Sequence, residues 1–142
     1  MTVARIINEK GGYVVTAAPE TSLAEVAAAL AEKRIGAVVV AEQDDIRGIV
    51  SERDIIRALA EFGSDALRKL ASDCMTTKVV TCRPTDTIHD VMQKMTSGRF
   101  RHLPVLEDGK LVGIVSIGDV VKSRIEEVER EAEQIREYIA MA

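Results

Sequence analysis

The sequence is poor in aromatic residues and in cysteine. Its 142 residues include no tryptophan, two phenylalanines, two tyrosines and two cysteines. Recognition of nucleic acid by stacking bases on aromatic side chains is therefore not expected. The net charge of −4 also argues against the basic surface that nucleic-acid polymers require. Two cysteines are too few for a disulfide framework.

Long hydrophobic runs are also missing. The longest, residues 35–41, is far shorter than the roughly 20 residues that span a bilayer. No charged-then-apolar leader opens the chain, so we expect a cytoplasmic protein with no membrane contact. The spacings of Cys74, Cys82, His89 and His102 match no zinc pattern, so we predict no metal site.

An internal repeat is what the sequence does contain. Gly48-Ile-Val-Ser51-Glu-Arg-Asp54 recurs 65 residues later as Gly113-Ile-Val-Ser116-Ile-Gly-Asp119. Residues 14–57 and 79–122 share 13 identities in 44 aligned positions, where ordinary composition gives roughly three or four. Units of about 45 residues are too small to hold a good core alone, so the two halves are expected to share one.

Each repeat has the pattern strand, helix, strand, strand, helix. Short β-branched runs at 13–16 and 78–81 predict the first strands, and apolar residues at helical spacing follow them. These apolar positions are Leu23, Val26, Ala27, Leu30 and Ala31, and Ile88, Val91, Met92 and Met95. Asp108-Gly109 predicts a hairpin turn, and Pro104 an incompletely paired or ligand-facing strand position. The predicted fold is α/β (α+β), with repeat 1 at 1–62, a linker at 63–73, repeat 2 at 74–124 and a C-terminal helix at 125–142.

The C-terminal residues have a different periodicity. Their apolar positions follow a 4-3-4-3-4-3 spacing, typical of the a/d seam between paired helices. These positions are Val121, Ile125, Val128, Ala132, Ile135, Ile139 and Ala142. In a parallel pair, Arg124 can meet Glu129 of the partner and Glu131 can meet Arg136. We therefore favour a homodimer through this helix. The alternative is a helix packed on its own domain.

The two Ser-x-x-Asp elements allow two interpretations. A serine after a strand can cap the next helix, and an acidic residue three positions later can reach back to its amide. A short carboxylate beside the open amides of a helix start also suits a ribose phosphate. The ribose hydroxyls would donate to the carboxylate, and phosphate oxygens would accept from the amides. Lys10-Gly11-Gly12 could approach a phosphate or be a plain turn.

Two such elements, each following strand–helix–strand, resemble a tandem of cystathionine-β-synthase (CBS) domains, often called a Bateman module. The resemblance covers about residues 6–124. It implies two pseudo-symmetric β-α-β-β-α repeats packed sheet to sheet, with a long C-terminal helix after them. It also implies clefts between the repeats that bind adenosine-containing ligands such as AMP, ADP, ATP, NAD(H) or S-adenosylmethionine. In the family, the aspartate holds the ribose hydroxyls.

The resemblance assigns residues to each cleft by position. The first cleft would contain Gly12, Tyr13, Ile35, Gly36, Ala37, Arg101, His102, Ile114, Ser116 and Asp119. The second would contain Ile49, Ser51, Arg53, Asp54, Thr77, Lys78 and Phe100. Arg101 and His102 favour a phosphate-bearing ligand beside Asp119, although ordinary surface residues would explain them as well. Arg53 could supply charge beside Asp54 or pair with its own neighbours.

The sequence therefore predicts a regulatory adenine-nucleotide sensor with no catalytic role and with an unidentified regulated partner protein. The alternative is a structural dimerisation or adaptor module whose clefts are vestigial. No nucleophile–base pair, P-loop or metal set supports an enzyme.

Overall fold

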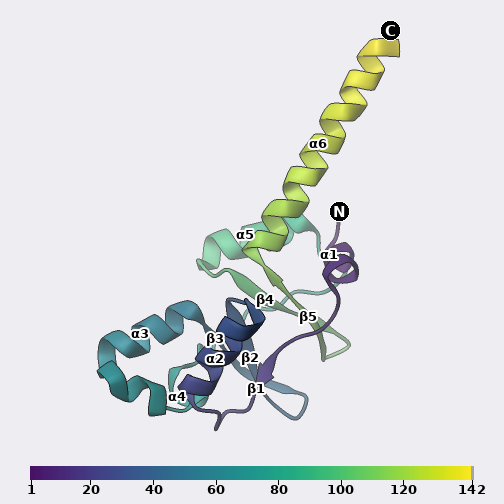
Figure 1. Ribbon diagram of the computed structural model, residues 1–142. Coiled ribbons are helices and arrows are strands. Elements are labelled where there is room, and N and C mark those ends of the chain that lie inside the picture. The colour runs from purple at the N-terminus through teal and green to yellow at the C-terminus, as the bar shows by residue number, and fades with distance from the viewer. Residues whose placement is uncertain (142) are drawn as a thin grey trace. The chain divides into compact units, whose positions relative to one another are not determined.

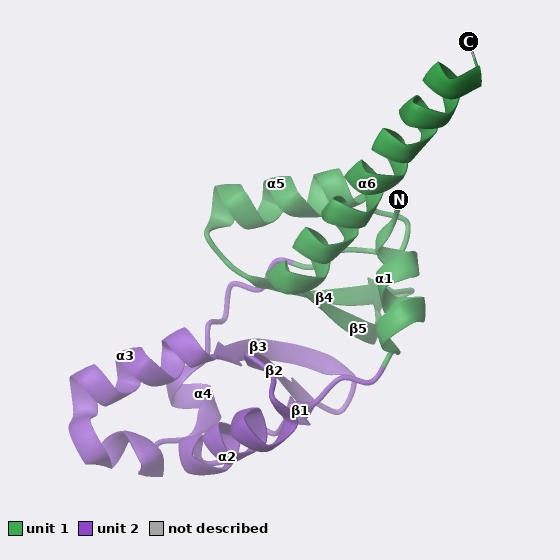
Figure 2. Cartoon of the chain, turned by 45° about the horizontal axis from the view of Figure 1, so that its top comes forward, with its two compact units in different colours: residues 1–12, 81–142 green, residues 13–80 purple. Residues whose placement is uncertain are grey.

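The computed structural model describes residues 1–141 and divides into two compact units (Figure 2). Unit 2 is continuous from Tyr13 to Val80, whereas unit 1 combines Met1–Gly12 with the chain from Thr81 onward. The units therefore differ from the sequence repeats in one respect. Residues 1–12, at the start of the chain, belong with the second repeat, and the residues that lead into the second repeat, up to Val80, belong with the first.

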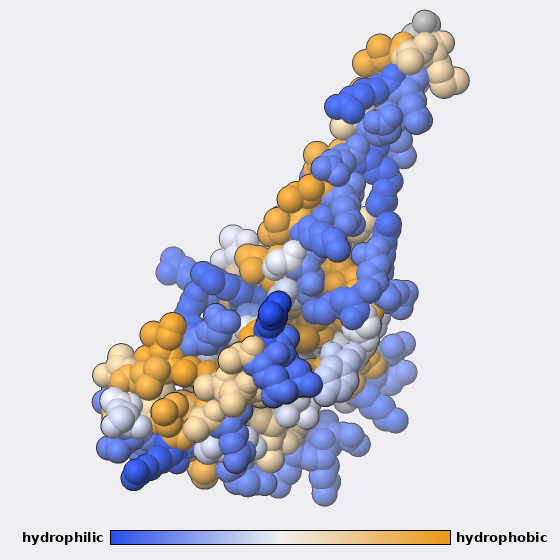
Figure 3. All heavy atoms as spheres, in the orientation of Figure 1, coloured by the Kyte–Doolittle hydropathy of each residue, from blue (hydrophilic) through white to orange (hydrophobic). Residues whose placement is uncertain are grey.

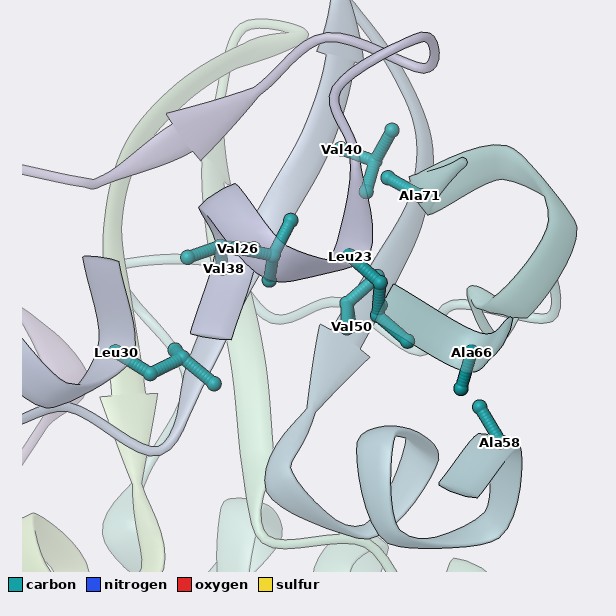
Figure 4. Close-up of a cluster of buried hydrophobic side chains, with 9 residues drawn as sticks. All are labelled: Leu23, Val26, Leu30, Val38, Val40, Val50, Ala58, Ala66 and Ala71. Carbon is teal, nitrogen blue, oxygen red and sulfur yellow. The ribbon is translucent and has the colours of Figure 1, made fainter. Parts of the chain in front are cut away.

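Unit 2 contains a three-stranded sheet and its helices (Figure 1). Strands β1 and β2 are parallel, β2 and β3 are antiparallel, and the strand order is β1-β2-β3. In chain order the elements are β1 (Thr16–Ala17), α2 (Leu23–Lys33), β2 (Ala37–Glu42), β3 (Asp45–Ser51), α3 (Glu52–Phe62), the 3-10 helix η1 (Gly63–Arg68) and α4 (Ala71–Cys74). Buried aliphatic side chains from the sheet and helices form one cluster (Figure 4): Leu23, Val26, Leu30, Val38, Val40, Val50, Ala58, Ala66 and Ala71.

Unit 1 contains a two-stranded antiparallel sheet, β4-β5. Its elements are α1 (Val3–Lys10), α5 (Ile88–Gly98), β4 (His102–Glu107), β5 (Lys110–Ser116) and the long α6 (Ile117–Met141). The sequence did not predict α1. This helix buries Val3 and Ile6, and the Val3 amide donates to the carbonyl of Asp86 at 2.9 Å. Burial and a contact with a residue 83 positions away therefore stabilise a helix of only eight residues, which would be marginal in isolation.

The two repeats share local details as well as element order. Ser22 and Thr87 cap α2 and α5 by accepting a hydrogen bond from the amide three residues later. Both helices end at an arginine in the left-handed conformation, Arg34 (φ 55°) and Arg99 (φ 56°). Each following hairpin has one register shift, after Val40 and after Val105 in β2 and β4. The predicted α/β fold with two similar repeats and a long C-terminal helix is confirmed.

The first strand of each repeat lies later in the chain than the sequence predicted. Instead of 13–16, β1 is Thr16–Ala17, and instead of 78–81 the second repeat has a single bridge between Cys82 and Val105. The Val39 amide donates to the Val15 carbonyl at 3.3 Å. Pro104 occupies the equivalent position and has no N–H to give. This side of β4 is therefore incompletely paired, as Pro104 predicted.

Candidate functional site

Both Ser-x-x-Asp elements lie where a strand ends and a helix begins, from β3 to α3 and from β5 to α6. The Asp54 amide donates to Ser51 Oγ (3.4 Å), and the Ser51 amide donates to Asp54 Oδ2 (2.9 Å). For Asp119 and Ser116 the equivalent distances are 3.2 Å and 2.9 Å. Both copies are thus helix caps, and capping holds each carboxylate at the positive end of a helix.

The Asp54 carboxylate is enclosed by its own unit, with 3% of its surface exposed. Its Oδ2 accepts from the amide and from the hydroxyl of Ser51 (3.1 Å). Its Oδ1 accepts from Thr76 Oγ1 and from Arg57 Nη1, both at 3.0 Å. A carboxylate has about four lone-pair positions, and these bonds occupy them. A ligand could reach Asp54 only by displacing one of these donors.

The Asp119 carboxylate is more accessible, with 24% of its side chain exposed. Its Oδ2 accepts from the Ser116 amide and from Lys10 Nζ at 2.7 Å. Lys10 Nζ also donates to the Ile114 carbonyl oxygen at 3.0 Å. Burial acts to raise the pKa of Asp119, but hydrogen bonds from Lys10 and Ser116 outweigh it, so this pKa lies below its ordinary value. The carboxylate is therefore ionised at neutral pH and can accept hydrogen bonds from hydroxyl groups.

A pocket of about 100 Å³ lies beside this ion pair in unit 1. Its lining residues come from α1 and α6 and are Ile6, Glu9, Lys10, Asp119, Lys122 and Ser123. Sites for whole small-molecule ligands typically measure about 300–1,000 Å³. This pocket alone can therefore hold water, an ion or one end of a ligand, but not a nucleotide.

The two aspartates differ because different segments lie against them. The 65-residue offset aligns Lys10 with Met75 and Gly11 with Thr76. Asp54 thus receives a hydroxyl whose backbone is fixed, since Thr76 and Ile49 exchange hydrogen bonds of 3.0 and 2.9 Å. Asp119 receives an ammonium on a flexible four-carbon chain instead. The ammonium can leave its carboxylate without backbone movement, which the Thr76 hydroxyl cannot do as easily.

The glycine of each motif permits these segments to approach. A Cβ at Gly48 would lie 2.7 Å from the Thr76 carbonyl oxygen, and a Cβ at Gly113 would collide with the Ile7 side chain. At position 48 only glycine fits, because the contact is with backbone, whereas at position 113 the end of the Ile7 side chain would have to shift. Gly48 and Gly113 thus position the neighbours of the two carboxylates and contribute no chemistry themselves.

The start of each hairpin also lies beside a helix start. The Glu52 amide donates to the Gly36 carbonyl at 3.0 Å, and the Ile117 amide donates to the Arg101 carbonyl at 2.8 Å. His102 pairs with Ser116 in the β4–β5 register. Within unit 1, the backbone of 101–102 therefore adjoins the helix that carries Asp119.

The predicted site residues are distributed over both units. Unit 1 contains Gly12, Phe100, Arg101, His102, Ile114, Ser116 and Asp119, and unit 2 contains Tyr13, Ile35, Gly36, Ala37, Ile49, Ser51, Arg53, Asp54, Thr77 and Lys78. Unit 1 brings Ile114, Ser116 and Asp119 together through Lys10 and the cap. Unit 2 brings Ile49, Ser51 and Asp54 together beside Thr76. The grouping of residues from both units around one ligand stays a prediction.

Three residues that contact the carboxylates were missed as site residues. Arg57 had a readable signal, because it lies three positions after Asp54 on a helix. Lys10 was considered only as part of a turn that could approach a phosphate, not as a partner of Asp119, and Thr76 was not singled out. Lys10 and Asp119 are 109 residues apart and Thr76 and Asp54 are 22 apart, so local patterns could not pair them.

Cys74 and Cys82 are free thiols in the structure. Within residues 1–141, no three His, Cys, Asp or Glu side chains are placed to hold a metal ion. Desolvation by burial, followed by the charge of Asp86, raises the pKa of Cys82 to about 11. A thiol with this pKa is neutral at pH 7 and a weak nucleophile. No helix in the described range has the length and apolar character needed to cross a bilayer.

Comparison with known proteins identifies the family. A family model of the CBS domain matches the chain twice, at residues 4–61 and 71–126. The chain belongs to the CBS domain family. A curated relative, the CBS domain-containing protein CBSX3, mitochondrial, of Arabidopsis thaliana, is 31% identical over 147 residues, which cover 97% of this chain and 71% of the relative.

Solved CBS structures share the fold over most of the chain. The CBS-domain containing protein ATU1752 from Agrobacterium tumefaciens is 45% identical, with a TM-score of 0.85, covering 87% of this CBS chain and 99% of that one. Protein PAE2072 from Pyrobaculum aerophilum, complexed with AMP, is 29% identical, with a TM-score of 0.75 and coverage of 84% and 89%. The CBS pair of MJ0100, in complex with 5′-methylthioadenosine and S-adenosyl-L-methionine, is 26% identical, with a TM-score of 0.79 and coverage of 89% and 98%.

Proposed function

We propose that this CBS pair is a regulatory module that binds an adenosine-containing ligand, with the ribose held at Asp119. The observation that carries the proposal is the partly exposed, ionised Asp119 carboxylate at the start of α6. Vicinal ribose hydroxyls can donate to such a carboxylate while helix-start amides face an anion. AMP in one related structure, and S-adenosyl-L-methionine with 5′-methylthioadenosine in another, support this ligand class.

Among adenosine ligands we favour those with phosphate, namely AMP, ADP, ATP or NAD(H). His102 is the first residue of β4 and Arg101 comes just before it, and the Arg101 carbonyl accepts from the amide of the first residue of α6. Two basic side chains next to the proposed ribose site suit a phosphate group. S-adenosylmethionine and 5′-methylthioadenosine have the ribose but no phosphate, so they would gain nothing from these side chains.

A thermal-shift panel on the purified full chain tests the ligand class. A ligand that binds only the folded state raises the melting temperature by mass action. We expect AMP, ADP, ATP, NAD or NADH to raise it more than adenosine does at equal concentration. A larger shift with S-adenosylmethionine would contradict the preference for phosphate.

Titration calorimetry with the best ligand then tests the site. Asp119→Ala should weaken binding by about 2–3 kcal/mol, or roughly 30- to 150-fold, because it removes a charged acceptor for two hydroxyls. Asp90→Ala is the matched control. Asp90 makes the same box with Thr87 at the start of α5 (3.1 and 3.4 Å) but lies outside the proposed site. Wild-type affinity in a folded Asp119→Ala protein would reduce Asp119 to a helix cap.

The second candidate is a structural dimerisation or adaptor module with vestigial clefts. The enclosed Asp54 favours it for that half of the molecule, because internal donors already occupy the carboxylate. A panel in which no adenosine ligand shifts the melting temperature would make this the better function. Both candidate functions are non-catalytic. In both, the partner protein would be identified by its binding to this chain.

A further inference from the structure

Helix α6 presents an apolar stripe that is largely exposed in the described part of the chain. The stripe consists of Val121, Ile125, Val128, Ala132, Ile135 and Ile139. Five of these side chains are exposed by 47% to 66%, and Ala132 is half-buried. Figure 3 shows apolar atoms following one side of this helix, with hydrophilic atoms beside them. The predicted seam position Ala142 lies outside the described residues.

The stripe is separate from the surface that holds α6 on its own unit. That surface includes the buried residues Val120 and Ser123, and it ends early in the helix. From Val128 to Met141 every residue except Ala132 is exposed. Figure 1 shows this part of α6 extending away from the other elements of unit 1. This exposed part of α6 therefore gains little stability from packing on its own unit. Isolated helices shorter than about 12–15 residues are marginal in water, so its own length stabilises it little as well.

Contacts within the helix do not replace a partner. Arg124 and Glu127 pair at 3.1 Å, and Arg136 and Glu133 pair at 3.4 Å. Such exposed pairs at i,i+3 contribute only about 0.2–0.5 kcal/mol each. Burial of a row of isoleucine and valine side chains stabilises far more.

Spacing and charge identify the occupant as a second copy of α6. The stripe alternates steps of four and three residues, so Ile125, Ala132 and Ile139 are a positions of a heptad. Parallel pairing then brings Arg124 next to Glu129 of the other copy and Glu131 next to Arg136, both attractive. Residues 120–141 contain six glutamates and four basic residues, which does not suit an anionic lipid surface.

We propose that α6 forms a parallel coiled coil with α6 of a second copy of this chain. The exposed arginines exchange their weak pairs within the helix for pairs across the interface. The two CBS pairs then lie at the same end of the coil, and the helix that carries Asp119 in its first turn ends in the shared interface. This assembly does not depend on ligand binding.

Sedimentation velocity on the full chain tests the interface with two neighbouring substitutions. Ile135→Asp places a charge in the seam, whereas Gln134→Asp places the same charge one residue away at an outward c position. We expect wild type and Gln134→Asp to self-associate at micromolar concentration. Ile135→Asp should weaken association on the order of 100-fold. A monomeric wild type, or equal association of both variants, would overturn the proposal.

A charge exchange tests the parallel alignment. Glu131→Arg should weaken association by about three- to tenfold, and the double variant Glu131→Arg, Arg136→Glu should restore it. Failure of the double variant to recover would overturn the parallel register. Flotation of wild type, but not Ile135→Asp, with vesicles of phosphatidylcholine and phosphatidylglycerol would assign the stripe to a membrane instead.

Discussion

Asp54 and Asp119 occupy equivalent positions in the two repeats and cap their helices alike, yet their surroundings differ. Asp54 is 3% exposed and meets the Thr76 hydroxyl and the Arg57 guanidinium. Asp119 is 24% exposed at the side chain and meets the flexible Lys10. The motif alone therefore determines where the carboxylate lies. The segment packed against it determines whether a ligand can reach it.

The largest difference between the two aspartates should appear in stability. We expect Asp54→Ala to lower the free energy of unfolding by about 3 kcal/mol, because it removes a buried carboxylate that accepts four hydrogen bonds and also removes the cap of α3. Asp119→Ala should cost only about 1 kcal/mol, since its partners stay in contact with water. Urea denaturation followed by circular dichroism measures both.

Equal losses in the two variants would show that the enclosure of Asp54 carries no extra stability. Asp90→Ala calibrates the cost of losing a cap alone, because its box is exposed and has the same geometry. We expect its loss to match that of Asp119→Ala within about 0.5 kcal/mol.

A second difference between the repeats is the position shared by Val39 and Pro104. Val39→Pro should lower the free energy of unfolding by about 1–2 kcal/mol, because it removes the bond from this amide to the Val15 carbonyl. Val38→Pro is the control, since Val38 pairs with Val50 in the β2–β3 ladder, and proline there should cost more. Chemical denaturation gives the free energies, and hydrogen exchange should become faster in 15–17. Equal damage from both prolines would contradict this account of the shortened second sheet.

The sequence predicted those parts of the fold whose causes are local. Helical spacing located α2 and α5, and Asp108-Gly109 located the β4–β5 turn, because these patterns act over a few residues. The predicted bounds of the first strands were wrong because these strands extend only where backbone groups of β2 and β4 can pair with them. Helix α1 was missed because its stability comes from contacts with Pro84 and Asp86, far along the chain.

The candidate site divides in the same way. Ser51, Asp54, Ser116 and Asp119 were readable because the cap is a four-residue device. Their different accessibility was not readable, since it follows from Thr76 and Lys10, which the fold brings in from other elements. The sequence expected the Asp119 half to differ through Arg101 and His102. The structure adds Lys10 as a second, independent difference.

The smallest predicted effect concerns Lys10 and is measured as a pKa. Lys10→Met introduces the residue that the other repeat has at this position, Met75, and removes the ammonium from Asp119. Burial acts to raise the pKa of Asp119, and Lys10 and Ser116 lower it. Without Lys10, only Ser116 still lowers this pKa, so the pKa of Asp119 should rise above its wild-type value. NMR titration of the Asp119 carboxyl carbon checks this directly, with Asp90 as the internal reference.

The same substitution predicts a pH-dependent loss of stability. In wild type, the pKa of folded Asp119 lies below the pKa of the unfolded chain, which is about 4. The ion pair therefore contributes its full stability above that unfolded pKa. This contribution is lost as the pH falls through the folded pKa. Lys10→Met should therefore be less stable than wild type by about 1 kcal/mol or less at pH 7, and the difference should shrink below about pH 4. A difference that stays constant from pH 7 to pH 3 would mean that Lys10 acts through packing and not through the charge of Asp119.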